Sequence, residues 1–411
     1  MIDLRIPILC GLIRLVISFV FPSLKYQLDN TAEFSTPFTS YKSLKEGVYL
    51  LRHGFSLYNG GIVHQPPILL AFLQPFMRLG IDYILYSVVD SIICYQIMEL
   101  ANSRSPQFSI FLKKHNGTSI VTIIGLLYAL NPLTVLSTIS GSSTIFTNLA
   151  ISSTLFFISK EYILASSIAV AIAGYLSAYP ILLVIPLLSL VHGTKPKSFQ
   201  SILSNKDVKL SILIVLTSVL VFLLLSYQLS GHSYDYISFC YIQHLSFGKS
   251  FPNIGLWWYF FIEMFNSFVP FYKAVFNVFL FSFIVPFTMR FHSTPLSAFI
   301  LSLGWITLTK PYPTLGDYGF FLSFLPLFQK LFGYMKFPVV SALLILHAII
   351  LSPLFYHLWI DLGSGNSNFF YALTLIYALG MGSILADITW ASLRFEYDKG
   401  KPDYSKKITQ I

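Results

Sequence analysis

Long runs of apolar residues, separated by short polar stretches, dominate the chain from end to end. A helix that crosses the hydrocarbon core of a bilayer needs roughly 20 apolar residues, with about 17 to 25 as the usual range. The pattern therefore predicts a polytopic helical membrane protein, although several of the runs are short or adjoin the next without a loop. The twelve predicted spans lie near residues 6–21, 82–101, 118–139, 145–159, 162–177, 179–192, 210–230, 271–289, 295–310, 316–333, 337–357 and 368–391.

Two further segments, 62–79 and 254–268, are apolar but are bounded by proline or rich in aromatic residues. The bilayer core tolerates irregular backbone only where protein or a cavity covers it. We therefore predict interfacial or re-entrant helices for both segments. Residues 1–411 then form a single integral membrane domain with basic cytosolic loops and tail, and with short lumenal loops at 22–61, 231–253 and 358–367.

The composition agrees with this all-α membrane fold. Of the 411 residues, 55% are hydrophobic and only 10% are charged, and the mean hydropathy is +0.70. A soluble domain carries roughly 25% charged residues, so these values exclude a cytosolic enzyme, a disordered chain and a disulfide-stapled secreted domain. The three cysteines (Cys10, Cys94 and Cys240) are scattered without CxxC spacing, which predicts neither a disulfide framework nor a zinc site.

The basic residues predict the orientation of the chain in the membrane. Lys and Arg number 26 against 17 Asp and Glu, which gives a net charge of +9. With both ends in the cytosol, 17 basic residues fall on the cytosolic side and 8 on the lumenal side, as the positive-inside rule requires. Membrane orientation therefore explains the charge, and we expect no nucleic-acid partner. The sequon Asn116-Gly117-Thr118 then faces the cytosol and should be unmodified.

Arg14 lies in the middle of the first predicted span, where a charge costs roughly 2.5–3.5 kcal/mol on insertion scales. It can bind a lipid phosphate, extend to the interface, or pair with an intramembrane carboxylate such as Asp90. Charged residues within spans usually pair with one another, so we favour a structural role.

The loop that follows the first span bears on enzymatic function. Membrane glycosyltransferases of the GT-C class place an acidic pair there, as a general base or a metal ligand. This loop offers only Asp29, Asn30 and Glu33 near its start, with Glu46 further on, and no adjacent acidic pair. Asp29 and Glu33 have helical i, i+4 spacing, so a dyad is geometrically allowed. Because carboxylates are mostly exposed in proteins, we expect a solvated loop face instead.

Cys240 and His244 are also four residues apart, in the 231–253 loop. A Cys–His pair suits acyl or amide transfer. Catalytic pairs usually come from separate elements and have a third orienting group, so we interpret this spacing as coincidence.

Three other segments of the lumenal side combine polar groups with proline or aromatic residues. They are His64-Gln65-Pro66-Pro67, the block Pro252–Phe260 with Glu263 shortly after it, and Lys310–Asp317. The aromatic residues of the second block favour the headgroup level of the membrane. In the third, the prolines supply a bend and Gly316 a permissive backbone, which predicts a structural turn.

The turn Gly363-Ser364-Gly365-Asn366-Ser367-Asn368-Phe369-Phe370-Tyr371 lies between the last two predicted spans. Small residues let a ligand approach the backbone, and Asn side chains offer donors and acceptors to a phosphate or sugar. Asn366 or Ser367 can also cap the final helix, whose amino end favours an anion. A cap needs one polar side chain, whereas this turn supplies several beside an aromatic wall.

These blocks make the chain resemble the PIG-U family, the polytopic subunit of the GPI transamidase complex of the endoplasmic reticulum. The resemblance runs from the first span nearly to the tail. Its most specific parts are PNIGLWWYFFIEMF, YPTLGD and LWIDLGSGNSNFFYA, with Asn131-Pro132 and Tyr179-Pro180 in support; the three blocks lie at 252–265, 312–317 and 358–372.

The resemblance implies a GT-C-like architecture without the acidic motif, no cofactor, and a non-catalytic subunit that is multi-pass in the endoplasmic reticulum membrane. The complex joins a protein to the ethanolamine amine of a GPI lipid, and its nucleophile belongs to a separate caspase-like subunit. Membrane lipids, the GPI lipid and the other subunits are then the partners. This chain would bind the GPI lipid and present it to the catalytic subunit. The implied substrate-binding residues are Asn366, Ser367, Asn368, Phe369, Tyr371, Asn253, Trp257 and Asp317.

Two other functions stay open at this point. A GT-C-type glycosyltransferase that uses a polyprenyl-phosphate sugar would require Asp29 or Glu33. A transporter or lipid flippase, suggested by the number of spans and by Arg14, would move a ligand across a vesicle bilayer.

Overall fold

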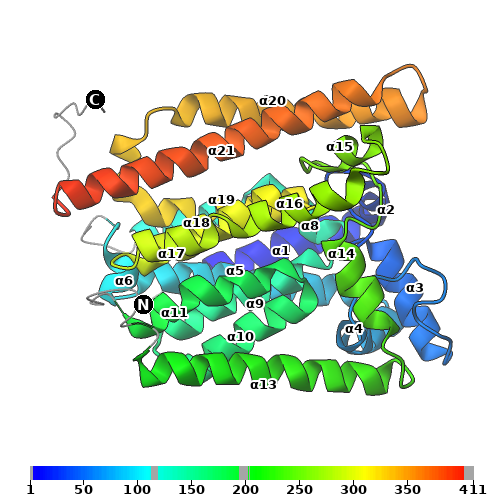
Figure 1. Ribbon diagram of the computed structural model, residues 1–411, viewed down its shortest axis with the longest axis horizontal. Helices are drawn as coiled ribbons and strands as arrows, with labels where there is room; N and C mark the ends of the chain where they lie inside the picture. The colour runs from blue at the N-terminus through cyan, green and yellow to red at the C-terminus, as the bar shows by residue number, and fades with distance from the viewer. Residues whose placement is uncertain (1–2, 113–118, 194–201, 203, 402–411) are drawn as a thin grey trace.

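The computed structural model describes residues 3–112, 119–193, 202 and 204–401, most of which are helical, with no strand among them (Figure 1). The predicted all-α membrane fold is confirmed. The elements are α1 (Arg5–Val20), α2 (Pro22–Asp29), α3 (Tyr41–Arg52), α4 (Pro67–Leu79), α5 (Asp82–Asn102), α6 (Pro106–Ser109), α7 (Ser119–Ala129), α8 (Pro132–Ile139), α9 (Thr144–Ser159), α10 (Ile163–Leu176), η1 (Tyr179–Leu183), α11 (Val184–His192), α13 (Lys206–Leu229), η2 (Ile237–Ile242), α14 (Gln243–Leu245), α15 (Trp258–Glu263), α16 (Val269–Phe281), α17 (Ile284–Arg290), α18 (Pro295–Thr309), α19 (Leu315–Leu322), η3 (Leu325–Tyr334), α20 (Pro338–Tyr356), η4 (His357–Asp361) and α21 (Ser367–Tyr397).

The helices coincide with the predicted apolar runs, but fewer of them are long enough to cross a bilayer alone. Among the described residues, five helical stretches meet that length and apolarity, or seven if each of two bent pairs is one span. The bent pairs are α1–α2, with an angle of 93°, and α7–α8, with an angle of 46°. Proline at the first position of α2 and α8 explains both breaks, because it cannot continue the preceding hydrogen-bond ladder. Twelve spans and the GT-C architecture stay predictions.

The run predicted as one span over 316–333 is divided. It forms α19 and then the 3₁₀ segment η3, whose Phe328 has non-helical backbone angles. The two predicted interfacial segments contain only short helices, α4 and α15. The predicted sequon at 116–118 lies outside the described residues.

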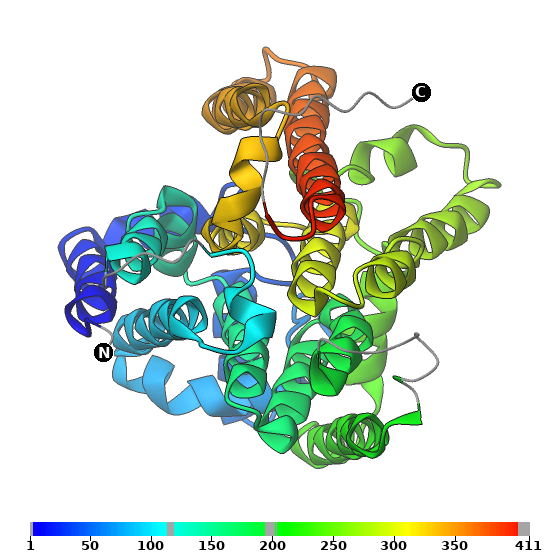
Figure 2. The same cartoon turned by 90° about the vertical axis from the view of Figure 1, so that its left-hand side faces the viewer.

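The long helices run side by side along the longest axis of the molecule, as the end-on view also shows (Figure 1, Figure 2). Helices α2, α3, α14 and α15 gather with the α20–α21 turn at one end, on the right in Figure 1. The start of α1 and the end of α21 lie at the opposite end. We call the first the lumenal end, after the orientation that the basic residues predict.

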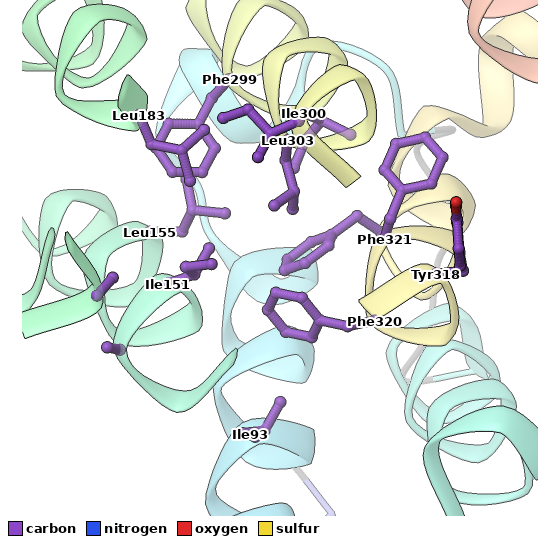
Figure 3. Packing of buried hydrophobic residues seen from close by; sticks show 14 of the residues in the cluster. Ile93, Ile151, Leu155, Leu183, Phe299, Ile300, Leu303, Tyr318, Phe320 and Phe321 are labelled. Carbon is purple, nitrogen blue, oxygen red and sulfur yellow. The ribbon is translucent and has the colours of Figure 1, made fainter. Parts of the chain in front are cut away.

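The core is built around α18, which is buried at every position except Trp305. Figure 3 shows its side chains facing those of α5, α9, η1 and α19. A helix that is apolar on all sides belongs in the interior, which explains this central position. By contrast, α13 and the α16–α17 pair are buried over only 17% and 11% of their apolar windows. Lipid or protein partners must therefore cover their outer faces. The labelled core residues in Figure 3 include Ile93, Ile151, Leu155, Leu183, Phe299, Ile300, Leu303, Phe320 and Phe321.

Arg14 forms a buried ion pair with Asp90, which confirms the structural interpretation of this intramembrane charge. The Arg14 guanidinium also donates to the carbonyl oxygens of Cys10 (3.2 Å) and Ala129 (2.5 Å). The hydroxyl groups of Tyr128 and Thr138 donate to the Asp90 carboxylate, that of Thr138 at 3.1 Å. Both charged side chains are at most 1% exposed, so the network joins α1, α5, α7 and α8 inside the fold.

Gly316 has a role different from the one predicted. It lies in helix α19 rather than in the turn, and a Cβ at this position would lie 2.1 Å from the Ser137 Oγ. Gly319 packs in the same way, with its would-be Cβ 2.7 Å from the Leu133 Cβ. These glycines therefore let α19 and α8 approach closely, and the prediction that Gly316 supplies backbone freedom was wrong.

Candidate functional site

Two hydrogen bonds and two glycines fix the backbone of the α20–α21 turn. The amides of Ser364 and Gly365 both donate to the carbonyl oxygen of Leu358, at 3.0 and 2.8 Å. Gly363 has a positive φ of 63°, and a Cβ on Gly365 would lie 2.9 Å from the backbone of residues 358 and 359. Both glycines are therefore needed for this turn.

Asn366 is the N-cap of α21, and its side-chain oxygen accepts from the amide of Asn368 at 2.9 Å. The predicted cap is confirmed. Ser367 donates to the same side-chain oxygen at 3.2 Å. The Asn366 side chain is exposed, and its amide nitrogen has no hydrogen bond within the described residues. The cap thus uses one part of the Asn366 side chain and leaves its donor group available.

An aromatic cluster lies directly behind this turn. Trp258 is its centre: it is 4% exposed and stacks against Trp359 with ring centroids 6.0 Å apart. Phe370 contacts both rings and is fully buried. The cluster joins α15 to the start of α21, two segments about 110 positions apart along the chain. Its members are Trp258, Tyr259, Phe355, Tyr356, Trp359, Phe370 and Tyr371, packed around Ala32 of the first lumenal loop.

Two tyrosines connect the cluster to the polar turn. Tyr259 stacks on Tyr371 with ring centroids 4.7 Å apart, and its hydroxyl donates to the side-chain oxygen of Asn368. The Tyr371 hydroxyl donates to the carbonyl oxygen of Leu256 at 3.0 Å. Asn368 and Phe369 are exposed, whereas Tyr259 and Tyr371 are half-buried. The result is a lumenal surface with aromatic walls and amide and hydroxyl groups within reach of a ligand.

Asn253 and Trp257, the two predicted site residues of the Pro252–Phe260 block, lie below this surface. Asn253 is fully buried; its side-chain oxygen accepts from Gly255 at 2.7 Å, and its amide donates to Phe251 at 2.9 Å. The Trp257 indole donates to the carbonyl oxygen of Thr309 at 2.7 Å, and its ring stacks on Phe276. Both residues therefore fix the shape of the block that carries Trp258 and Tyr259.

Asp317 is in a different place from the other predicted site residues. Its Oδ2 accepts from the Thr314 amide and hydroxyl, at 2.8 and 3.0 Å, in a capping box at the start of α19. Its Oδ1 pairs with the Lys310 ammonium at 2.7 Å. The structure thus brings the residues of the 366–371 turn together with the aromatic block and places Asp317 in a separate, largely buried region.

Asp29 and Glu33 of the first lumenal loop are buried, so the expectation that they form a solvated face was wrong. Asp29 is 6% exposed and caps α3, accepting from the amides of Tyr41 and Lys42 at 2.8 and 2.9 Å. Glu33 is 1% exposed, and its Oε1 accepts from the Ser352 hydroxyl at 2.5 Å. Burial raises the pKa of Glu33. Both side chains connect the loop to the helices around it.

Cys240 and His244 lie in η2 and α14, and both are buried. Burial raises the pKa of the Cys240 thiol to about 12 and lowers the pKa of His244 to about 3. A nucleophilic cysteine needs the opposite arrangement, a thiolate stabilised beside a cation. The Cys240 thiol instead contacts the Tyr58 hydroxyl at 3.7 Å.

One polar region escaped the sequence analysis. Ser143, Thr144 and Thr147 lie at the amino end of α9 and line a small pocket with residues from five other segments of the chain, at 38–39, 64, 176–177, 240–244 and 310–317. The signal was a run of small hydroxylated residues between two apolar stretches. Within the described residues, no group of three or more His, Cys, Asp or Glu side chains is arranged to hold a metal ion.

Comparison with known proteins gives consistent matches over nearly the whole chain. The family model described as GPI transamidase subunit PIG-U matches residues 8–377. The GPI transamidase component GAB1 of Saccharomyces cerevisiae is 52% identical over 410 residues, which cover 99% of each chain. The GPI-anchor transamidase component PIGU of Homo sapiens is 30% identical over 401 residues, which cover 91% of this chain and 90% of the human one.

Proposed function

The chain belongs to the PIG-U family of GPI transamidase subunits, and from this premise we propose that it binds the GPI lipid and presents it to a catalytic subunit during anchor attachment. The proposal includes the endoplasmic reticulum membrane as its location, and the other subunits, among them a caspase-like cysteine protease, as its partners. The relatives in yeast and human are both named as components of the transamidase, which supports a role as one subunit of an assembly.

The observation that carries the proposal is the meeting of the 366–371 turn with the aromatic block of α15 at the lumenal end. The Asn amide groups can donate to a glycan or a phosphate, and the hydroxyl oxygens of Tyr259 and Tyr371, whose hydrogens are donated within the protein, can accept from a glycan hydroxyl. The aromatic rings behind them provide a flat apolar wall, as small-molecule sites commonly do. Helices α20 and α21 extend from this surface through the apolar region, where acyl chains would lie.

The mechanism that we propose is proximity. A bound GPI lipid would hold its amine beside an acyl-enzyme that the catalytic subunit has formed. Attack then becomes effectively unimolecular, which lowers the barrier by about 7–11 kcal/mol in well-oriented cases. The chain itself supplies no nucleophile in this proposal, and the buried, protonated thiol of Cys240 supports that assignment.

The test is an Asn368→Leu substitution in the purified complex, with a fluorescent GPI analogue as the probe. Loss of one or two hydrogen bonds should weaken binding by roughly two- to tenfold, while subunit assembly is unchanged. The matched control is Asn266→Leu, which removes an exposed amide outside the aromatic cluster. Unchanged binding by the Asn368 variant would contradict this assignment of the site.

A further inference from the structure

An apolar cleft opens between α4, α9, α10 and α13, away from the α20–α21 turn. Its volume is about 590 Å³, which is in the range of roughly 300–1,000 Å³ typical of ligand pockets. Phe72, Phe146, Ile168 and Phe222 are among the side chains that line it. The cleft is therefore large enough for a substantial ligand.

The cleft offers that ligand only apolar contact. Ser153 and Tyr175 are its two hydroxyl-bearing residues, and each already has a partner in the protein. The Ser153 hydroxyl accepts from Gln96 at 2.8 Å, and the Tyr175 hydroxyl bonds Ser226 at 2.6 Å. From Phe146 to Phe157 the cleft follows α9 for about 17 Å, at 1.5 Å per residue. That length is close to half of the roughly 30 Å hydrocarbon core, so the cleft matches the chains of one leaflet.

A polar pocket adjoins the lumenal end of the cleft, and the two cavities share Leu176 in their walls. Its volume is about 30 Å³, and a water molecule needs roughly 10–15 Å³ on this measure. Lys310, Asp317, His64, His244, Thr144 and Thr147 contribute its polar groups. The pocket therefore admits a small polar group and excludes a glycan.

Two features of the polar pocket favour an anion. His244 is 6% exposed, and its Nε2 has no hydrogen-bond partner within the described residues. The amino end of the 16-residue helix α9 also lies in the wall, and its N-cap Ser143 makes no side-chain capping bond. Because Lys310 and Asp317 neutralise each other, the positive end of the helix decides the sign of the local potential. A phosphodiester carries one negative charge and acceptor oxygens for the His244 imidazole and the threonine hydroxyls.

We infer that this pair of cavities is a phospholipid site, with one acyl chain in the apolar cleft and the lipid phosphate in the polar pocket. The cleft is apolar throughout and as long as one leaflet, and the polar pocket is at its lumenal end, where lipid headgroups lie. The site is built from α4, α9, α10, α13 and α14 together with residues of the 38–39, 64 and 310–317 segments. None of its residues belongs to the aromatic cluster, so it can be tested without reference to that cluster.

The experiment uses the assembled complex in phosphatidylcholine nanodiscs that contain a phosphatidylcholine with a photoreactive acyl chain. Labelled residues are mapped by peptide mass spectrometry. We expect labelling of the cleft-facing residues of α9 and α10 to exceed labelling of the exposed face of α13, which serves as the reference for bulk lipid. Equal labelling of the two regions would overturn the proposal.

Substitutions separate the two parts of the site. Ala165→Phe fills the cleft and should remove the excess labelling, whereas Leu164→Phe, on the exposed side of the same helix, should leave it unchanged. His244→Phe keeps the ring that stacks on Phe38 but removes the unpartnered nitrogen, and should reduce the excess at least roughly tenfold. If that variant does not assemble, Thr147→Val removes a pocket hydroxyl with less change of shape. Excess labelling that survives in both pocket variants would overturn the role of the phosphate.

Two control compounds test whether binding needs both the acyl chain and the phosphate of one lipid. Diacylglycerol with the same photoreactive chain lacks the phosphate and should show no excess labelling. Inorganic phosphate lacks the chain and should not displace the labelled lipid. Excess labelling by diacylglycerol would show that the cavities do not bind the two parts of one lipid together.

Discussion

The Arg14 network and the 366–371 turn are both rich in polar atoms, but they use those atoms differently. In the network, the guanidinium and the Asp90 carboxylate are buried, and hydrogen bonds with Cys10, Ala129, Thr134, Tyr128 and Thr138 complete their coordination. In the turn, Asn366 and Asn368 are exposed, and the protein uses only part of each side chain. The first region joins helices, and the second leaves donors and acceptors available to a ligand.

This difference teaches which polar residues of a membrane protein to consider for function. A charge inside a span is unusual and attracts attention, yet Arg14 is fully occupied by the fold. Asp29 is also occupied, as the cap of α3, whereas Glu33 uses Oε1 for Ser352 and leaves its buried Oε2 without a partner within the described residues. The residues of the turn carry no charge, and it is their incomplete use by the protein that makes them candidates for ligand binding.

The largest effect is expected from breaking the Arg14 network. Arg14→Met leaves the Asp90 carboxylate buried and unpaired, and should destabilise the chain by about 3–5 kcal/mol. Replacing both partners, with Arg14→Met and Asp90→Leu together, should recover most of that loss, because no buried charge remains. The unfolding midpoint in detergent measures both effects. If Arg14→Met is as stable as the wild type, the Arg14 network does not stabilise the fold, and the difference between the two regions is contradicted.

An intermediate effect is expected at Glu33, and it depends on pH. Burial raises the pKa of this carboxyl, so the folded state retains the proton after the unfolded state has released it. Stability should therefore fall as pH rises from the ordinary value of 4.5 towards the raised pKa, by about 1.4 kcal/mol for each pKa unit between the two states. Glu33→Gln cannot ionise and should abolish this dependence.

The pH series has a matched control in the same loop. Glu46 is exposed, so Glu46→Gln should leave the pH dependence of the unfolding midpoint as in the wild type. The activity of the complex, measured in the same samples, distinguishes a loss of stability from a loss of catalysis. Activity that is lost in Glu33→Gln while the fold remains stable would favour the glycosyltransferase alternative, which needs a working carboxylate in this loop.

Much of the fold was predictable because apolar runs and proline positions determine where helices begin and end. The bounds of α1, α5, α9, α18 and α20 agree with the predicted runs to within a few residues. The division of the 316–333 run was not predictable, because a change of backbone angles at Phe328 leaves no mark in hydropathy. The role of Gly316 depends on a neighbouring helix, α8, that is almost 180 positions away in the chain.

The candidate site was predictable only in part, for a similar reason. The turn at 363–371 could be recognised from its own residues, since the glycines and the N-cap act locally. Its contact with Trp258 and Tyr259 required the tertiary fold. Asn253 was predicted from the family resemblance to bind the substrate; both of its side-chain groups form hydrogen bonds with neighbouring backbone inside the protein, which its sequence position alone did not indicate.

The smallest effect is expected at Asn366, and it separates a helix cap from a ligand contact. Asn366→Leu removes the cap of α21 and should destabilise its first turn by about 0.5–2 kcal/mol. Asn366→Ser keeps an oxygen that can cap, so stability should return to within a few tenths of a kcal/mol. Hydrogen exchange at the amides of residues 368–370 measures this local stability. The serine hydroxyl lacks the two donors of the amide, so GPI binding should stay weakened in Asn366→Ser even though the helix is restored. Binding that recovers fully with the cap would show that this position serves only the helix, and the difference between the turn and the Arg14 network would then rest on Asn368 and the tyrosines.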